Sequence, residues 1–195
     1  MSPVKREQVF NLPNLITLLR VGSIPLLMGM LYLPEAGWHW AAAILFFVAG
    51  LSDLADGLLA RRMKKVTVLG QFLDPLADKL LIASMLVMLV MLGRAEAWAA
   101  VVIICREVAV TGLRAVAAAQ GLAVPSDRWG KAKTALQMLA VLLLIMPEPV
   151  AGLDPRYWGA LVLWCATLVS FVSGLRYFVR FNRLYMGQSE GTRKI

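Results

Sequence analysis

The chain has 195 residues, of which 59% are apolar and 16% are charged, and its mean hydropathy is +0.70. A soluble domain of this length cannot bury so much apolar surface, so the composition places the chain in a bilayer. No Pro-, Ser- or Gly-rich linker divides it, and we predict a single domain over 1–195. The net charge of +8 fits a basic rim that faces anionic lipid headgroups, and no nucleic-acid-binding module is apparent.

Six apolar stretches are long enough to cross a membrane as helices, which takes about 20 residues each. Turn-forming or helix-breaking residues such as Pro34, Gly93 and Gly121 separate them. We therefore predict an all-α, polytopic membrane protein with six transmembrane helices and room for a short N-terminal interfacial helix before them. The predicted spans are 14–33, 38–60, 72–92, 97–119, 129–146 and 157–180.

The distribution of lysine and arginine predicts the orientation in the membrane. Six spans put both termini on the same side. If that side is the cytosol, Arg94 and Arg156 are the only two of the 20 basic residues that fall on outer loops. The positive-inside rule therefore predicts cytosolic termini.

Four aspartates fall inside the predicted spans, where an ionised side chain is costly unless it is paired or bound to metal. Asp53 and Asp56 lie near the end of the second span, and Asp74 and Asp78 lie near the start of the third. Since these spans run in opposite directions, both pairs reach the same depth, and the spacing within each pair puts its side chains on one helical face. Four carboxylates in a low-dielectric cavity need positive charge, which divalent cations supply best.

The residues around the aspartates indicate which ions and ligands would fit. Oxygen ligands without nearby cysteine or histidine favour Mg²⁺ or Mn²⁺. Gly57 and Gly70 remove side chains beside the carboxylates, which leaves space for a phosphate group. The alternative interpretation is a structural ion-pair network between the aspartates and Arg61, Lys79 and their neighbours.

The one histidine and the two cysteines of the sequence do not form a second candidate metal site. We expect His39 at the outer interface, and we expect Cys105 and Cys165 to be buried thiols. The fourth span contains Arg106 and Glu107 at a depth where both must face the interior. Arg176, Arg180 and Arg183 are interpreted as ordinary positive charge at the inner end of the last span.

The aspartates belong to a longer pattern. From Asp53, the residues DLADGLLAR, then eight others, then GQFLDPLAD give the spacing DxxDGxxAR, x8, GxxxDxxxD. This pattern is similar, at every fixed position, to the signature of the CDP-alcohol phosphatidyltransferase family. The eight matching residues are Asp53, Asp56, Gly57, Ala60, Arg61, Gly70, Asp74 and Asp78.

The resemblance implies a six-helix membrane enzyme, usually a homodimer, which binds two divalent metals, Mg²⁺ or Mn²⁺, and a CDP-linked lipid. By position, it implies that Asp53, Asp56 and Asp74 are metal ligands. Asp78 would be both a metal ligand and the catalytic base that deprotonates the acceptor hydroxyl. The residues implied to bind the CDP-lipid are Asp56, Gly57, Arg61 and Gly70.

Three further segments resemble one bacterial branch of this family, which makes phosphatidylglycerophosphate and CMP from CDP-diacylglycerol and glycerol 3-phosphate. They are NLITLLR from Asn14, REVAVTGLR from Arg106 and GKAKT from Gly130. One departure is Ala115, where that branch often has glutamate. We predict this reaction, with an active site on the cytosolic side of a bacterial inner membrane.

Glycerol 3-phosphate would bring a dianionic phosphate, which requires fixed positive charge on the cytosolic side. The side chains predicted to bind it are Thr17, Arg20, Arg106, Arg114, Lys131 and Lys133. The same chemistry with another acceptor would make a phosphatidylserine, phosphatidylinositol-phosphate or cardiolipin synthase. A more distant alternative is a divalent-cation transporter, which predicts carboxylates spread across the bilayer rather than gathered at one depth.

Overall fold

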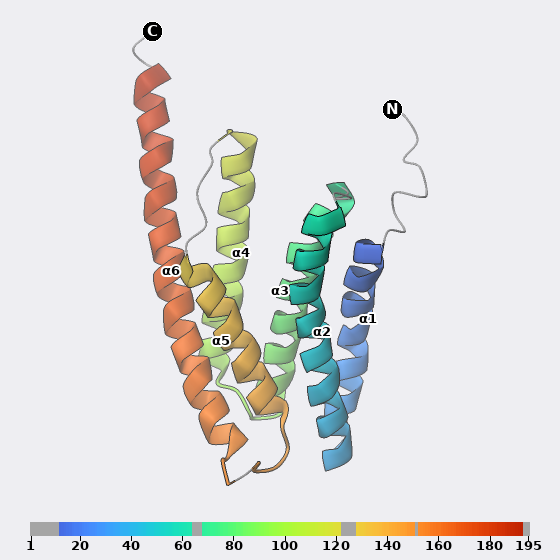
Figure 1. The fold of residues 1–195 in the computed structure, drawn as a ribbon. Coiled ribbons are helices and arrows are strands. Elements are labelled where there is room, and N and C mark those ends of the chain that lie inside the picture. Colours follow the sequence, from blue (N-terminus) through green and yellow to red (C-terminus); the bar gives the residue numbers. More distant parts are fainter. Residues whose placement is uncertain (1–11, 64–67, 122–127, 151, 193–195) are drawn as a thin grey trace.

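The computed structural model describes residues 12–63, 68–121, 128–150 and 152–192, and it shows six helices and no strand in that part of the chain. The helices are α1 (Leu12–Tyr32), α2 (Ala36–Met63), α3 (Val68–Met91), α4 (Ala97–Ala119), α5 (Arg128–Ile145) and α6 (Pro155–Thr192). They run up and down as one bundle, and α1 begins at the same end at which α6 terminates (Figure 1). The all-α prediction is confirmed for the described residues.

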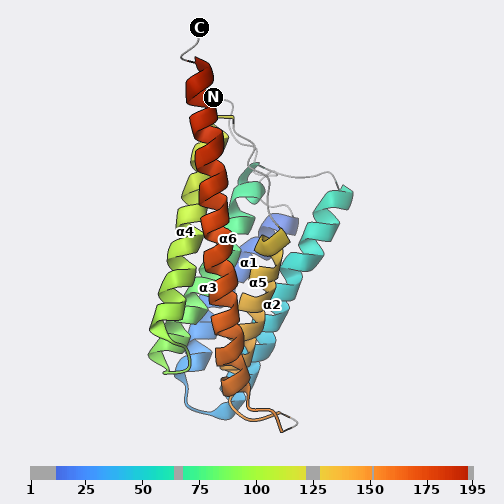
Figure 2. The same ribbon diagram turned by 90° about the vertical axis from the view of Figure 1, so that its left-hand side faces the viewer.

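Five helices begin and end within four residues of their predicted bounds, and α4 matches them. The sixth differs, because it continues twelve residues beyond the predicted end at position 180, to Thr192. Apolar periodicity locates the part of a helix that would lie in lipid, but no proline after Pro155 ends the helix itself. α6 therefore extends past the other helices (Figures 1 and 2).

The interior is divided between an apolar half and a polar half. The apolar core fills the half of the bundle away from the start of α1, and its fully buried members include Leu31, Phe46, Leu89, Ile103 and Ile145. The other half contains most of the buried polar side chains of the described residues: Thr17, Arg20, Ser23, Lys133, Gln137, Ser170 and Ser173. Buried polar groups are costly unless they are satisfied, so their gathering at one end locates the candidate site.

Arg94 closes the apolar end of the bundle. It lies between α3 and α4, and its Nη1 donates to the carbonyl oxygens of Leu144 and Ile145, the last residues of α5, at 3.4 and 3.0 Å. Its Nη2 lies 3.0 Å from Nδ1 of His39, which is 6% exposed. Carbonyls at a helix C-terminus have no partner within the helix, and a cation satisfies them. His39 is thus part of a helix-end contact.

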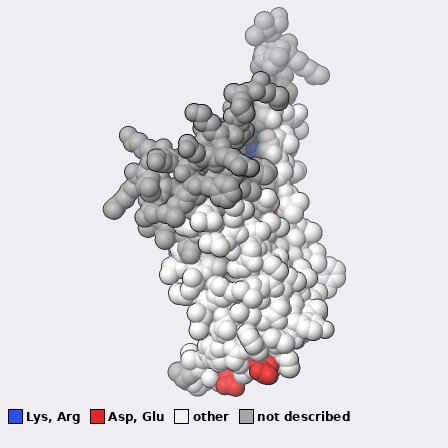
Figure 3. Space-filling view, turned by 90° about the vertical axis from the view of Figure 1, so that its right-hand side faces the viewer, with Lys and Arg blue, Asp and Glu red and all other residues white. Residues whose placement is uncertain are grey.

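The outer surface of the helices is strongly apolar. Large side chains such as Leu19, Ile44, Val108 and Leu168 are all more than 60% exposed. On the face shown in Figure 3, acidic side chains lie at the lower end, and the described surface above them shows almost no charged side chain. The cysteines lie on this surface as well, because Cys105 and Cys165 are exposed; the expectation that they are buried was wrong.

Within the described residues, two helical segments are long and apolar enough to cross a membrane by length and composition, Leu15–Tyr32 and Pro155–Met186. Shorter apolar segments occupy Ala36–Leu51 and Ala132–Ile145. α4 is long enough but contains three charged residues, Arg106, Glu107 and Arg114. The six-span prediction is therefore not established by hydropathy alone.

Candidate active site

Arg20 of α1 connects the two helices that contain the four aspartates. Its Nε donates to the carbonyl oxygen of Ala49 in α2 at 3.1 Å, and its Nη1 donates to Oδ1 of Asp78 in α3 at 2.9 Å. Arg20 is 3% exposed, and Ser23 Oγ donates to its carbonyl oxygen at 2.7 Å. Arg20 thus links the level of Ala49 in α2 to that of Asp78 in α3 and marks the register between the two helices.

This register brings the aspartate positions to one end of the bundle. Ala49 lies one turn before Asp53 in α2, and Asp78 lies one turn after Asp74 in α3. Since α2 and α3 run in opposite directions (Figure 1), positions 53 and 74 both lie about 6 Å beyond the level of Arg20 along the helix axes. Several candidates for metal and CDP-lipid binding lie outside the described side chains: Asp53, Asp56, Gly57, Arg61, Gly70 and Asp74. Among the side chains that are described, no three of His, Cys, Asp or Glu gather as a metal-binding group.

A second polar cluster joins α4, α5 and α6. Glu107 Oε1 accepts hydrogen bonds from Arg106 Nη1, at 2.7 Å, and from Lys133 Nζ. The other two nitrogens of Arg106 donate to α6, Nε to the carbonyl oxygen of Ser170 at 3.2 Å and Nη2 to Oγ of Ser173 at 2.9 Å. The three charged side chains are at most 15% exposed. They form a buried network with two cations and one anion.

Lys79 lies between the two clusters. It follows Asp78 in α3, and its Nζ donates to Oγ1 of Thr111 in α4. Thr111 in turn donates to the carbonyl oxygen of Glu107 at 2.6 Å. Asp78 thus accepts from Arg20 on one side of α3, while its neighbour Lys79 contacts α4 on another.

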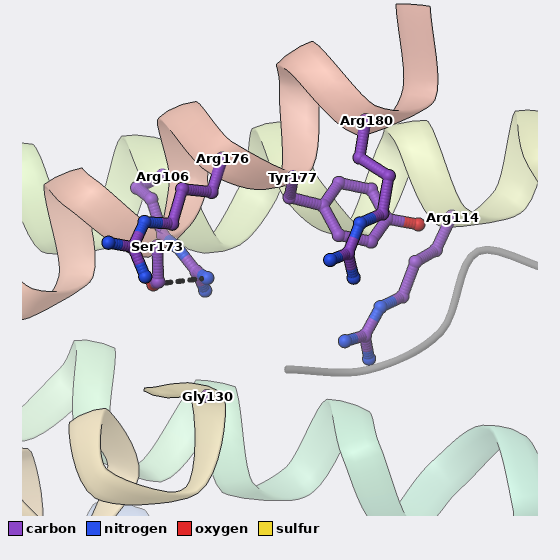
Figure 4. Close-up of a pocket in the computed structure, with 7 residues that line it drawn as sticks. All are labelled: Arg106, Arg114, Gly130, Ser173, Arg176, Tyr177 and Arg180. Carbon is purple, nitrogen blue, oxygen red and sulfur yellow. Dashed lines mark hydrogen bonds between the residues drawn. The ribbon is translucent and has the colours of Figure 1, made fainter. Parts of the chain in front are cut away.

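A pocket opens beside the second cluster (Figure 4). Arg106 and Ser173 lie at one end of it, and Arg114 and Tyr177 lie at the other, where the guanidinium carbon is 5.6 Å from the centre of the ring. The lining residues are Arg106, Arg114, Gly130, Ser173, Arg176, Tyr177 and Arg180. Among the described residues, four arginines and no carboxylate line this pocket. Guanidinium groups form bidentate hydrogen bonds with phosphate, so the pocket suits a phosphate dianion.

The structure separates the side chains that we predicted to bind the acceptor phosphate. Arg106 and Arg114 line the pocket, and Lys133 is connected to it through the carboxylate that it shares with Arg106. Thr17 and Arg20 are buried in α1 and are not among the lining residues. One predicted residue lies outside the described side chains: Lys131.

The contribution of α6 to the pocket was missed in the sequence. From the sequence, Arg176 and Arg180 are interpreted as ordinary positive charge at the end of a span, yet both line the pocket together with Ser173 and Tyr177. These four positions follow the spacing i, i+3, i+4 and i+7, which puts them on one face of a helix. That spacing was the available signal, and the cluster was read only by its charge.

Comparison with known proteins decides the family. A sequence model described as CDP-alcohol phosphatidyltransferase matches residues 10–172. The chain belongs to the CDP-alcohol phosphatidyltransferase family. It is therefore a transferase, and the match includes the two aspartate-bearing helices and the three charged residues of the second cluster, Arg106, Glu107 and Lys133.

Relatives of this family member come from several bacteria. A Bacillus subtilis protein named CDP-diacylglycerol–glycerol-3-phosphate 3-phosphatidyltransferase is 43% identical over 182 residues, which cover 87% of this chain and 94% of the relative. A Rickettsia felis protein of the same name is 36% identical over 171 residues, covering 86% of this chain and 93% of the relative. A Mycobacterium tuberculosis protein named as a probable phosphatidylglycerophosphate synthase is 37% identical over 183 residues, covering 91% and 85%.

Proposed function

We propose that this phosphatidyltransferase moves a phosphatidyl group from CDP-diacylglycerol to glycerol 3-phosphate, giving phosphatidylglycerophosphate and CMP. The observation that supports this acceptor is the four-arginine pocket at the aspartate end of the bundle. An acceptor with its own phosphate needs such a pocket, and serine does not. The names of the bacterial relatives point to the same reaction.

The four aspartates are proposed to hold two divalent metal ions. The donor set is entirely oxygen, which suits Mg²⁺ or Mn²⁺, and the contacts of Arg20 with Ala49 and Asp78 support a common level for the four positions. Bound there, the ions would neutralise charge on the diphosphate and stabilise departing CMP. Asp56, Gly57, Arg61 and Gly70 are proposed to bind the CDP portion of the lipid.

Asp78 is the proposed base for the acceptor hydroxyl. It is the member of the aspartate set that is described, and its side chain is 35% exposed, so that it is accessible. Arg20 fixes one carboxylate oxygen, which orients the group. A base must lie within hydrogen-bond reach of the proton that it removes, so its orientation matters. Because Arg20 donates to Asp78 and does not line the pocket, we assign it to the orientation of Asp78 rather than to the acceptor phosphate.

The acceptor phosphate is proposed to bind in the arginine pocket. Arg106 and Arg114 from α4 line the pocket together with Arg176 and Arg180 from α6, and Gly130 of α5 lies across from them (Figure 4). The Arg114 guanidinium stacks over the ring of Tyr177, which holds it in place. Thr17, Lys131 and Lys133 would contribute less directly.

We further propose that all six helices span a bacterial inner membrane, with the active site and both termini facing the cytosol and a homodimer as the working unit. The exposed apolar side chains support a lipid-facing surface. The division of the interior also favours an enzyme over a cation transporter, because a transport path needs polar groups through the whole depth, and the described core is apolar at one end.

The test is an acceptor assay with detergent-purified protein. CDP-diacylglycerol is supplied with Mg²⁺ and, in separate reactions, glycerol 3-phosphate, serine, inositol phosphate or phosphatidylglycerol, and CMP release is measured. Of the four acceptors, we expect only glycerol 3-phosphate to give turnover, and we expect a chelator to stop the reaction until Mg²⁺ is restored. Turnover with serine but none with glycerol 3-phosphate would refute the proposed acceptor.

A further inference from the structure

We propose that Glu107 is a positioning residue for the acceptor phosphate. In this role its carboxylate holds Arg106 in the orientation that faces the pocket and keeps Lys133 beside it. The inference rests on the proposed function, because it assigns the pocket to the phosphate of the acceptor. Glu107 itself does not line the pocket, so its effect must pass through the two cations that it binds.

The guanidinium of Arg106 is held from three directions. Nε and Nη2 each donate to α6, and Nη1 donates to Glu107. A guanidinium has five N–H groups, so these contacts use three and leave one hydrogen on Nη1 and one on Nη2. Arg106 lines the pocket, and two parallel N–H groups are the donors that a phosphate accepts in a bidentate contact. Glu107 provides the single charged contact among the three.

Lys133 explains why that contact must be a carboxylate. This lysine of α5 is 5% exposed and donates to the same oxygen of Glu107 as Arg106 does. Two cations this close in a buried site repel each other unless an anion lies between them. With the carboxylate removed, the two cations would move apart, and Arg106 would lose the charged contact that holds it in its orientation at the pocket.

Gly174 is independent evidence that the path of the Arg106 side chain is specified. A Cβ built on Gly174 would lie 2.8 Å from Cγ and 3.2 Å from Nε of Arg106. Real Cβ atoms do not approach other atoms so closely, and the atoms concerned are not at the flexible tip of the side chain. The absence of a side chain at Gly174 therefore leaves the space in which the Arg106 side chain passes α6 to reach Ser170 and Ser173.

Removal of the Glu107 carboxylate should change phosphate binding in the direction opposite to that expected from its charge alone. If Glu107 acted only through space, its removal would make the pocket more positive and would strengthen phosphate binding. If it positions Arg106, its removal weakens binding in spite of the added positive potential. The direction of the change in KM for glycerol 3-phosphate separates these two roles.

The main experiment compares Glu107→Gln with Glu107→Asp and with the matched control Glu96→Gln, which changes an exposed glutamate at the opposite end of the bundle. We expect Glu107→Gln to raise the KM for glycerol 3-phosphate at least tenfold while kcat at saturation stays within threefold. Glu107→Asp should restore part of the loss, and the control should match the wild type. An unchanged or lower KM in Glu107→Gln would overturn the proposal.

A second variant tests the same idea without changing any charge. Gly174→Ala should displace Arg106 and raise the same KM severalfold, whereas Gly29→Ala, which has open space around the added methyl group, should not. This variant also decides the matter if Glu107→Gln fails to fold in detergent. A KM for Gly174→Ala equal to that of the wild type would then overturn the proposal.

Binding measurements keep this inference separate from the proposed function. Calorimetric titration of glycerol 3-phosphate and of inorganic phosphate into the wild type and Glu107→Gln, without CDP-diacylglycerol, measures the pocket alone. Phosphate binding that weakens in Glu107→Gln supports the positioning role even if the wild type transfers to another acceptor. Equal binding by both proteins contradicts that role even if glycerol 3-phosphate is the true acceptor.

Discussion

Replacing Arg20 by methionine should impair catalysis without preventing substrate binding. Methionine keeps an unbranched apolar stem in the buried site but removes both the contact with Ala49 and the charged contact with Asp78. A hydrogen bond to a charged group contributes roughly 1.5–3 kcal/mol, and the 35% exposure of the Asp78 side chain argues for the lower part of that range. At about 1.4 kcal/mol per factor of ten, kcat should fall about 10- to 50-fold.

The assay is CMP release at saturating glycerol 3-phosphate, with KM measured in parallel. Arg20→Lys should lie between the variant and the wild type, because an ammonium keeps the charge but cannot donate in two directions in one plane. Arg156→Met, at an exposed arginine on the other end of the bundle, is the matched control. If Arg20→Met raised KM for the acceptor and left kcat unchanged, Arg20 would bind the acceptor phosphate, and our assignment to Asp78 would be wrong.

Three further predictions concern single side chains. Asp78→Asn should abolish CMP release while binding of CDP-diacylglycerol, measured by titration, survives; retained turnover would remove the assignment as base. Tyr177→Leu should raise the KM for glycerol 3-phosphate about threefold, because it removes a cation–π contact with Arg114 worth about 0.5–1 kcal/mol, whereas Tyr177→Phe should not. Arg94→Met should lower the free energy of unfolding by about 1–3 kcal/mol, because it leaves buried carbonyls at the end of α5 without a donor; thermal unfolding in detergent measures this, and a change in acceptor KM would contradict a purely structural role.

The helices and the aspartate motif could be predicted because each depends on local pattern. Apolar length located five of the six helices to within four residues, and the spacing of Asp53, Asp56, Asp74 and Asp78 placed each pair on one helical face. The register between α2 and α3 could not be predicted. It depends on a contact between Arg20, Ala49 and Asp78, which are 29 and 58 residues apart in the chain.

The acceptor pocket was predicted only in part for a related reason. Arg106 and Arg114 stand out in the sequence because an ionised residue inside an apolar helix requires an explanation. Arg176 and Arg180 do not, because basic residues at the inner end of a span are common in membrane proteins. Their role depends on the way α6 packs on α4, where Gly174 lets the side chain of Arg106 cross.

The neighbouring residues Asp78 and Lys79 give a physical reason why the two halves of the site work at one fixed distance. Asp78 contacts α1 and Lys79 contacts α4, so a single stretch of α3 joins the aspartate end to the arginine pocket. Transfer requires the acceptor hydroxyl to reach the phosphorus while its own phosphate stays bound, and small displacements of reacting groups lower rates strongly. A helix is stiff over two residues, so a shift of α4 relative to α1 must strain one of these contacts. Changes at Lys79 should therefore affect kcat and acceptor KM together, unlike changes at Arg20 or Glu107, which should affect them separately.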